Sequence, residues 1–368
     1  MERKVPFADL RITDDKERKE LLEAIDTVFK HGRIVLGPEV GKFESKIADF
    51  CGRKYAMGVN SGTDALFLGL KSLGIGPGDE VITTSLSWVS GIATANPIAL
   101  TGAKPIFADI CDDLNIDPKS VERLITPRTK AILPIHYTGR ICKIHELMKI
   151  AEEHNLLLVE DASQAFSAST KGRKAGSFGD ISCLSMNPMK ILAACGEAGV
   201  VMTDDKAVYD RLISLRYNGV IKKEKHIEVT LNSRIDTLQA AILLNRLKNA
   251  DKIVQKRREI ASWYNDNLKG LVKVPVEPKK EKHVYYTYTI LAQRRDELKD
   301  FLKAKGIETK IQHLYLMPYQ QFNKENTIER PKNAEKLIKQ ILSLPTTEKL
   351  KFEDMKYVVN CIKEFYNE

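Results

Sequence analysis

The chain has 368 residues, of which 43% are apolar and 29% charged, and a formal net charge of +9, proportions ordinary for a globular protein with a large core. No apolar run approaches the ~18 residues that span a bilayer, and the N-terminus lacks the hydrophobic segment of a signal peptide, so we expect a cytoplasmic protein without a membrane partner. Its lysines are mixed with glutamates and form no basic stripe interleaved with aromatics, a pattern typical of a solvated surface rather than a nucleic-acid partner.

Two helices are expected at the start of the chain. Over about residues 14–31, apolar side chains repeat at helical spacing, and Asp14 with Glu17 resembles a capping box. A second helix follows the Gly37-Pro38 turn and ends at Gly52.

From about residue 55, short apolar strands alternate with helices. The expected strands are residues 55–59, 80–83, 105–108, 131–135 and 156–159, and the expected helices between them include 64–73 and 143–154. Strands that are apolar throughout and alternate with helices predict an α/β fold with a mostly parallel sheet covered on both faces. Ligands of such sheets bind beyond the carboxyl ends of the strands, where the chain carries Asn60, Ser85, Asp109, His136 and Asp161.

After about residue 205 the pattern changes to longer helices. Helical patterns cover residues 238–247 and 254–268, a β-rich stretch covers 285–291, and further helices are expected at 296–305 and after Glu353. We interpret residues 1–250 as a large domain and residues 251–368 as a smaller C-terminal α+β domain.

Lys190 and Asp161 are the candidate chemical groups. Asp161 ends an apolar strand, and Lys190 follows it by twenty-nine positions, just before a Cys-Gly-Glu-Ala-Gly turn at 195–199. A lysine and an aspartate on successive strand ends are what a pyridoxal phosphate (PLP) enzyme needs, because the lysine forms a Schiff base and the aspartate keeps the pyridine nitrogen protonated. The alternative is that Lys190 is one of many surface lysines.

Residues near the other strand ends could either bind a cofactor or substrate or have only a structural role. Residues 60–66 join a strand to a helix whose first amide groups could bind a phosphate, or could form only an ordinary cap. Trp88 could stack on a flat cofactor ring or pack in the core. Gln164 could point one helical turn beyond Asp161 toward a cofactor oxygen, or bond to backbone. His136 could contact a ligand or be structural.

Cysteine and histidine spacing predicts no metal site. The six cysteines form no C-x-x-C pair, and the histidines lack the spacing of metal ligands. Most of the cysteines are expected to be small core residues, and Cys195 is the one that falls near the candidate lysine.

Several motifs in fixed order carry a family resemblance. They are Asn-Ser-Gly-Thr-Asp-Ala-Leu at 60–66, Gly-Pro-Gly-Asp-Glu-Val-Ile at 76–82, Glu-Asp-Ala-Ser-Gln at 160–164, Lys190 with its Gly-Glu-Ala-Gly turn, and Asn-Ser-Arg-Ile-Asp-Thr-Leu-Gln-Ala at 232–240. This order resembles the DegT/DnrJ/StrS type of nucleotide-sugar aminotransferase, PLP enzymes of the aspartate-aminotransferase-like (type I) fold. The resemblance runs over nearly the whole chain.

The resemblance implies a role around the cofactor for each motif. Lys190 would hold PLP through a Schiff base, Asp161 would pair with the pyridinium nitrogen, and Gln164 would meet the ring oxygen. The other residues implied to contact the cofactor ring or its phosphate are Trp88, Gly62, Thr63 and Ser185.

The resemblance also implies a partner subunit and substrates. Asn232 would reach the phosphate in the partner's site, which makes the enzyme a homodimer with shared active sites. Arg234, His313 and Tyr315 would contact the nucleotide-sugar substrate.

The implied reaction moves an amino group from L-glutamate to a keto group of a nucleotide-linked sugar, giving an amino sugar and 2-oxoglutarate. The motif at 61–66 is similar to enzymes of 3-keto sugars, whereas Ser-Leu-Ser-Trp-Val-Ser at 85–90 and His-Tyr-Thr-Gly at 136–139 are similar to enzymes of 4-keto sugars, so both positions stay open. The alternative is a non-catalytic member of the fold that serves as a regulatory or binding protein.

Overall fold

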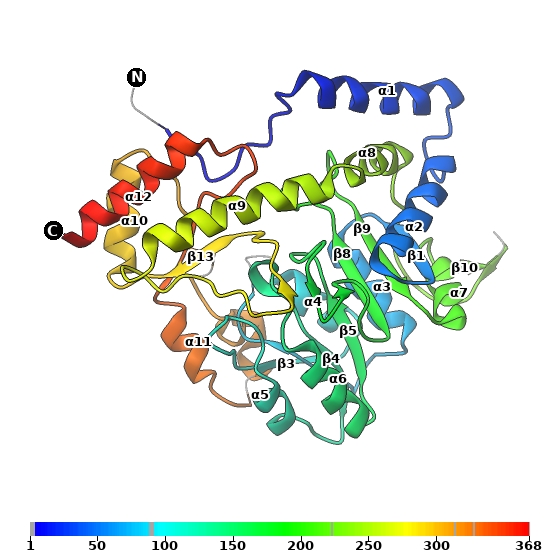
Figure 1. The fold of residues 1–368 in the computed structure, drawn as a ribbon. Helices are drawn as coiled ribbons and strands as arrows, with labels where there is room; N and C mark the ends of the chain where they lie inside the picture. The colour runs from blue at the N-terminus through cyan, green and yellow to red at the C-terminus, as the bar shows by residue number, and fades with distance from the viewer. Residues whose placement is uncertain (1–3, 88–91, 222–223, 313, 327, 368) are drawn as a thin grey trace.

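A computed structural model describes residues 4–87, 92–221, 224–312, 314–326 and 328–367 (Figure 1). The two N-terminal helices are confirmed as α1 (Asp15–His31) and α2 (Pro38–Cys51). The carboxylate of Asp14 accepts the amide of Glu17 at 2.7 Å, which is half of the predicted capping box. Helix α1 projects from one corner of the molecule, and the chain then turns into α2 (Figure 1).

A seven-stranded sheet forms the centre of the larger part of the chain. Its strands, in the order β1-β9-β8-β5-β4-β2-β3, are β1 (Tyr55–Val59), β9 (Gly199–Thr203), β8 (Ile181–Ser185), β5 (Leu157–Asp161), β4 (Thr129–Leu133), β2 (Glu80–Thr84) and β3 (Lys104–Ala108). Only β9 runs against its neighbours, since it pairs antiparallel with both β1 and β8 while the other pairs are parallel. The predicted mostly parallel sheet is confirmed, and β8 and β9 add two strands to the five expected.

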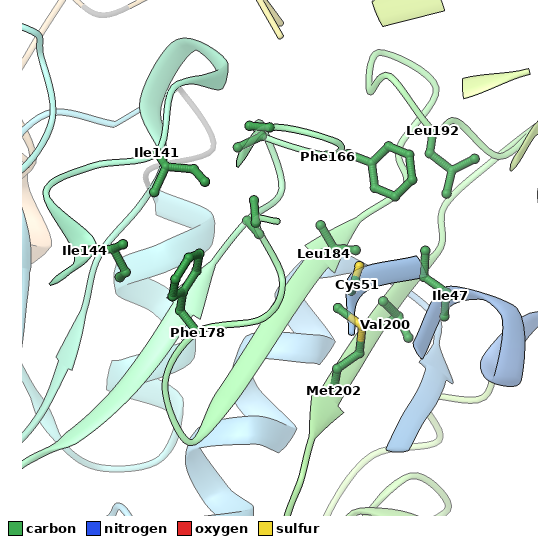
Figure 2. Packing of buried hydrophobic residues seen from close by; sticks show 14 of the residues in the cluster. Ile47, Cys51, Ile141, Ile144, Phe166, Phe178, Leu184, Leu192, Val200 and Met202 are labelled. Carbon is green, nitrogen blue, oxygen red and sulfur yellow. The ribbon is translucent and has the colours of Figure 1, made fainter. Parts of the chain in front are cut away.

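Helices cover both faces of this sheet. On one face, Val159 and Cys183 pack in a cluster with residues of α3 (Gly62–Ser72), α4 (Ile92–Leu100) and α7 (Lys206–Leu215). On the other face, Leu158 and Leu184 pack in a cluster with residues of α2, α5 (Pro118–Arg123), α6 (Ile144–Glu153) and α8 (Thr237–Leu247). Figure 2 shows this second face, where Leu184, Val200 and Met202 meet Ile47 and Cys51.

The alternation of side chains decides which residues can meet. Neighbouring residues of a strand point to opposite faces, and Leu158 and Val159 do so in β5. Glu160 therefore faces the α6 side of the sheet, while Asp161 faces the α3 side.

The C-terminal part of the chain packs around a second cluster. It combines Val5 with residues of α9 (Ala250–Leu268), α10 (Arg295–Ala304), α12 (Phe352–Asn367) and the antiparallel pair β13 (Tyr288–Leu291) and β14 (Ile341–Leu344). Between α10 and β14 lie two short 3-10 helices, η3 (Met317–Tyr319) and η4 (Gln321–Asn326), and α11 (Lys332–Leu337). The division into domains at residue 250 stays a prediction.

The remaining elements are short. A hairpin of β10 (Val220–Ile221) and β11 (Lys225–His226) projects beyond α7, and β6 (Ser169–Thr170), β7 (Arg173–Lys174) and β12 (Glu281–Lys282) form a small sheet. The 3-10 turn η2 (Tyr137–Gly139) follows β4. In the described ranges, no helix is both long and apolar enough to cross a membrane.

Candidate active site

A cavity of about 340 Å³ opens beyond the carboxyl ends of the parallel strands. Six of the residues singled out in the sequence line it together, and these are Gly62, Thr63, Asp161, Gln164, Ser185 and Lys190. They come from α3, from the ends of β5 and β8, and from the segments that follow these two strands. The position agrees with the general placement of ligands in open α/β sheets.

The first turn of α3 forms one wall of this cavity. Ser61 caps the helix, and its side-chain oxygen accepts the amide of Asp64 at 3.1 Å. A Cβ on Gly62 would lie 2.5 Å from the Cβ of Ser185, so only glycine allows the helix to approach β8 this closely. The first amides of the helix and the Ser185 hydroxyl are thereby held at one end of the cavity, an arrangement suited to an anion.

Asp161 presents a buried carboxylate to the cavity. Its side chain is 5% exposed, and its Oδ1 accepts the amide of Ser163 at 3.0 Å. The Thr94 hydroxyl lies 3.5 Å from the other oxygen. A carboxylate buried with so few donors gains from a cationic group of a ligand, because such a group would offset the cost of its burial.

Gln164 is held by a neighbouring turn. Its Oε1 accepts the amide of Thr138 at 3.1 Å, so the Nε2 group is the part that can donate to a ligand. Thr138 adopts a left-handed conformation, with φ at 62°. The expected helical turn between Asp161 and Gln164 is wrong, since the segment forms hydrogen-bonded turns, yet the side chain still reaches the cavity.

Lys190 lies in the loop of residues 186–198 between β8 and β9. Both ends of this loop are joined by the pairing of Ser185 with Gly199, and Asn187 donates to Glu197 across it at 2.6 Å. The Nζ atom of Lys190 lies 4.7 Å from the centroid of the Tyr286 ring. Tyr286 had no signal in the sequence, because it is distant along the chain and sits in an apolar stretch.

A second and larger cavity, of about 730 Å³, begins at the same lysine. Met189, Lys190 and Tyr286 line both cavities. The larger one is bounded by the N-terminal segment from Phe7 and by residues 344–349. Lys190 therefore lies where the smaller cavity meets the larger one.

Three of the predicted residues lie outside these cavities in their own chain. Asn232 is exposed and accepts a hydrogen bond from Arg234 at 3.0 Å, and the guanidinium of Arg234 stacks on the Tyr217 ring at 3.9 Å. Tyr315 is 67% exposed. Trp88 and His313 fall outside the residues that the structure describes.

The groups around the smaller cavity fit PLP. Its volume lies within the roughly 300–1,000 Å³ of small-molecule sites, and the amide-lined end left by Gly62 suits a phosphate. A primary amine and a buried carboxylate on the same cavity match the two groups that a pyridoxal ring requires.

Four of the six cysteines are buried in the structure. Cys51, Cys142, Cys183 and Cys361 are buried, whereas Cys195 is exposed. Burial raises the pKa of the Cys51 thiol to about 12, which keeps it protonated. Within the described part of the chain, no three His, Cys, Asp or Glu side chains are grouped to hold a metal.

Comparison with known proteins agrees with this geometry. The sequence matches the DegT/DnrJ/EryC1/StrS aminotransferase family over residues 15–363. It is 38% identical over 370 residues to a Geobacillus stearothermophilus protein named pleiotropic regulatory protein, with 98% of each chain covered. It is 37% identical over 370 residues to dTDP-3-amino-3,4,6-trideoxy-alpha-D-glucose transaminase of Streptomyces venezuelae, with 98% of this chain and 96% of the relative covered.

Solved structures give the same result. The fold matches S. venezuelae DesV in complex with a ketimine intermediate, with a TM-score of 0.95, 36% identity and 99% of both chains covered. It also matches NtdA from Bacillus subtilis with bound cofactor PMP, with a TM-score of 0.91, 30% identity, and 99% of this chain and 86% of that chain covered. Because the match extends over residues 15–363 and over nearly the full length of these relatives, the chain belongs to the DegT/DnrJ/EryC1/StrS aminotransferase family and is a pyridoxal phosphate enzyme.

Proposed function

We propose that this enzyme transfers an amino group from L-glutamate to a keto group, at the third or fourth carbon, of a nucleotide-linked sugar. The observation that carries the proposal is that Lys190, Asp161 and the first turn of α3 line one cavity. The transaminase from S. venezuelae, whose name specifies a dTDP-linked amino sugar, supports the class of acceptor. The products would be an amino sugar nucleotide and 2-oxoglutarate.

In this proposal, the residues of the smaller cavity hold the cofactor and handle protons. Bound PLP supplies an electron sink that stabilises negative charge on the substrate carbon. The Nζ atom of Lys190 would hold the cofactor covalently, and as a free amine it would remove and return the proton at the reacting carbon of the substrate. Asp161 would keep the ring nitrogen protonated, and the Nε2 group of Gln164 would donate to the ring oxygen.

The phosphate would lie against Gly62, Thr63 and Ser185, where the amides of α3 and a hydroxyl converge. Trp88 would cover the ring. The chamber of about 730 Å³ next to Lys190 is large enough for a bulky acceptor, while its mixed lysines and carboxylates do not specify which nucleotide it takes.

We further propose that the enzyme is a homodimer whose active sites contain residues of both subunits. Asn232 and Arg234 lie outside the cavity of their own chain, so the partner's Asn232 would complete the phosphate site and the partner's Arg234 would contact the substrate. Exposed apolar side chains near this segment support a protein interface, and they include Tyr217, Ile221, Ile227, Val229 and Leu231. His313 and Tyr315 would act on the substrate as well.

The second candidate is a regulatory protein without catalysis. One relative carries the name pleiotropic regulatory protein. A binding role would not require an amine and a buried carboxylate on the cofactor cavity. The presence of both Lys190 and Asp161 on this cavity therefore favours the enzyme.

The test is to incubate the purified protein with L-glutamate and a panel of 3-keto and 4-keto nucleotide sugars. We expect 2-oxoglutarate and one aminated sugar, and mass spectrometry and NMR identify the aminated carbon. A protein that binds PLP but aminates no sugar of the panel from any amino donor would favour the regulatory candidate.

A further inference from the structure

A buried pair of polar side chains lies on the side of the sheet away from the cofactor cavity. His136 follows β4 and Glu160 precedes Asp161 in β5, and both are 0% exposed. The Nε2 atom of His136 lies 2.8 Å from Oε1 of Glu160. Nδ1 of the same ring accepts the amide of Cys142 at 3.3 Å, so the ring proton lies on Nε2 and is donated to Glu160.

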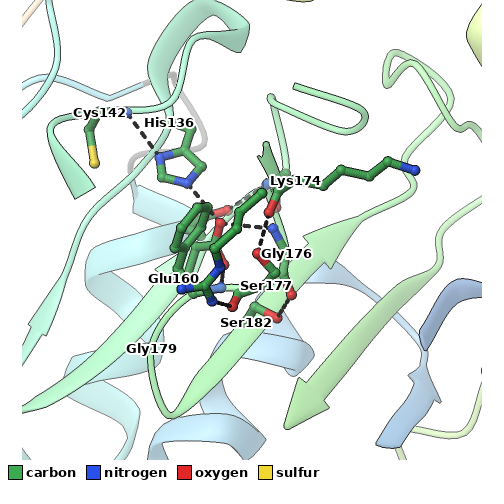
Figure 3. A network of polar contacts seen from close by, with 12 residues as sticks. His136, Cys142, Glu160, Lys174, Gly176, Ser177, Gly179 and Ser182 are labelled. Atoms are coloured by element: carbon green, nitrogen blue, oxygen red, sulfur yellow. Dashed lines mark hydrogen bonds and ion pairs between the residues drawn. The ribbon is translucent and has the colours of Figure 1, made fainter. Parts of the chain in front are cut away.

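The carboxylate of Glu160 is fully used. Besides the imidazole, it accepts the amides of Gly176 and Phe178, each at 2.8 Å (Figure 3). On its other side, the segment 176–179 is held through its carbonyl groups by the guanidinium of Arg53. This segment leads directly into β8, the strand that ends at Ser185 and precedes Lys190. The pair thus fixes the start of the strand that leads into the loop of Lys190.

The backbone of His136 connects the pair to the opposite side of the sheet. Its amide donates to the carbonyl of Asp161 at 3.2 Å, and the amide of Asp161 donates to Pro134 at 3.0 Å. Because neighbouring residues of a strand face opposite sides, anchoring Glu160 on one side sets the direction of the Asp161 carboxylate on the other.

The turn after His136 reaches two further residues of the cavity. The amide of Thr138 binds the Gln164 side chain at 3.1 Å. The carbonyl of Thr138 accepts the amide of Thr287, and that of Gly139 accepts the amide of Val284, so this turn brackets Tyr286. The ring of Tyr286 in turn contacts Lys190.

We propose that His136 and Glu160 form a positioning pair on the side of the sheet away from the cofactor cavity. The pair keeps the side chains of Asp161, Gln164 and Tyr286 in the positions that they need around the cofactor. The pair touches neither cofactor nor substrate, and the inference rests on the proposed roles of Lys190 and Asp161. Its mechanism is geometric, because the pair is connected to the cavity through adjacent residues of the chain and through hydrogen bonds of fixed direction.

The deciding variant is Glu160→Gln, which keeps the size of the side chain but turns one accepting oxygen into a donor that faces other N–H groups. The control is Glu80→Gln. Glu80 is equally buried, at 2% exposure, but it lies at the amino end of β2 and binds only Thr126 and Arg128. Both variants remove one buried carboxylate from the same sheet, and only Glu160 is connected to the cavity.

Four measurements are made on both variants and the unaltered enzyme: the melting temperature, the dissociation constant of PLP from the apoenzyme, the visible circular dichroism per bound cofactor, and kcat and KM. We expect Glu160→Gln to weaken PLP binding by up to about 100-fold, the scale of a small misplacement in a catalytic site, and to change the dichroism of the cofactor that remains bound. Glu80→Gln should lower the melting temperature and leave the other values unchanged. Equal PLP affinity and dichroism in the two variants would overturn the proposal and leave the pair a purely structural one.

Two further variants separate the possible failures. Lys190→Ala tests the site itself, since a cofactor that borohydride reduction still attaches covalently to this variant as it does to the unaltered enzyme would refute the assignment of the lysine and not the pair. If Glu160→Gln does not fold, His136→Gln is measured instead, because it keeps the carboxylate and its bonds to Gly176 and Phe178. Unchanged PLP affinity and dichroism in His136→Gln would equally reject the pair.

Discussion

The ammonium nitrogen of Lys190 lies over the face of the Tyr286 ring, 4.7 Å from its centroid, within the range of a cation–π contact. The contact brings a residue of the C-terminal half of the chain to the loop between β8 and β9. The Lys190 side chain therefore lies between two parts of the chain that line the same cavity.

Lys190→Ala tests the proposed role of this amine. We expect kcat for transamination to fall by at least about 100- to 10,000-fold, the usual contribution of a positioned acid–base group, and borohydride reduction no longer to attach the cofactor to the protein. Lys206→Ala is the matched control, because Lys206 lies on α7 at the surface, where it pairs with Asp210 and lies over the Tyr209 ring, away from the cavity. Turnover by Lys190→Ala at the rate of the control would refute the assignment.

Gly62→Ala tests the close approach of α3 to β8. The added methyl would meet Ser185 at 2.5 Å, so the helix start must shift, at a cost of about 1–3 kcal/mol of stability, and PLP affinity should fall. Gly41→Ala in α2 is the control, since no atom lies within 4 Å of the new Cβ and alanine favours a helix. Equilibrium dialysis of PLP measures the effect, and equal affinity in both variants would contradict it.

Mixing two inactive variants tests the shared active sites. Lys190→Ala and Asn232→Ala should each be inactive alone, because each removes a group from every site. If the partner's Asn232 completes the site, a mixed dimer contains one intact site, and equal amounts of the two variants should recover about a quarter of the full activity after subunit exchange. No recovery, when native mass spectrometry detects mixed dimers, would place Asn232 in its own subunit's site, and full activity of Asn232→Ala alone would place it outside any site.

The pH dependence of stability should include a contribution from His283. Burial, with smaller contributions from Arg140 and Arg258, lowers the pKa of this histidine from 6.5 to about 3, and its ring stacks on Tyr285 at 3.9 Å. Below pH 6.5 this histidine is protonated in the unfolded chain but stays neutral in the folded chain. The free energy of unfolding is therefore highest above pH 6.5 and decreases as the pH falls toward 3.

Between pH 7 and pH 5, this effect alone should remove about 2 kcal/mol from the free energy of unfolding. His283→Gln should lose that part of the pH dependence, while the exposed His154→Gln should keep it. Urea unfolding at the two pH values measures the difference, and the same pH slope in all three proteins would reject the assignment to His283.

The strands that position the site could be predicted from their composition. Buried parallel strands are apolar along their whole length, so residues 55–59 and 80–83 were recognised to within a residue of β1 and β2. The lysine and aspartate followed from the chemistry that a PLP site needs, and the DegT/DnrJ/StrS resemblance agrees with the family match.

Contacts made through tertiary packing could not be predicted. The antiparallel direction of β9 has no signature in a five-residue apolar run, because direction depends on the pairing partner. The contact between Tyr286 and Lys190 and the bond between Thr138 and Gln164 join segments whose spacing along the chain carries no pattern. The sequence alone does not distinguish a ligand-binding role of His136 from a structural one. Its hydrogen bonds to Glu160 and Cys142 show that its ring lies on the side of the sheet away from the cofactor cavity.

The reversed direction of β9 has a consequence for how such an enzyme can diverge. Because β9 runs antiparallel beside β8, the last residue of β8, Ser185, is paired with the first residue of β9, Gly199. The loop that carries Lys190 therefore starts and ends at this one pair of residues. We expect Pro188 and Met189, which line the larger cavity, to be exchangeable inside this closed loop without moving any strand of the sheet. Substitutions in the loop can thus change the wall of the larger cavity beside Lys190 while the position of Lys190 is kept. Substrate preference could then evolve without a change in the proposed role of the lysine.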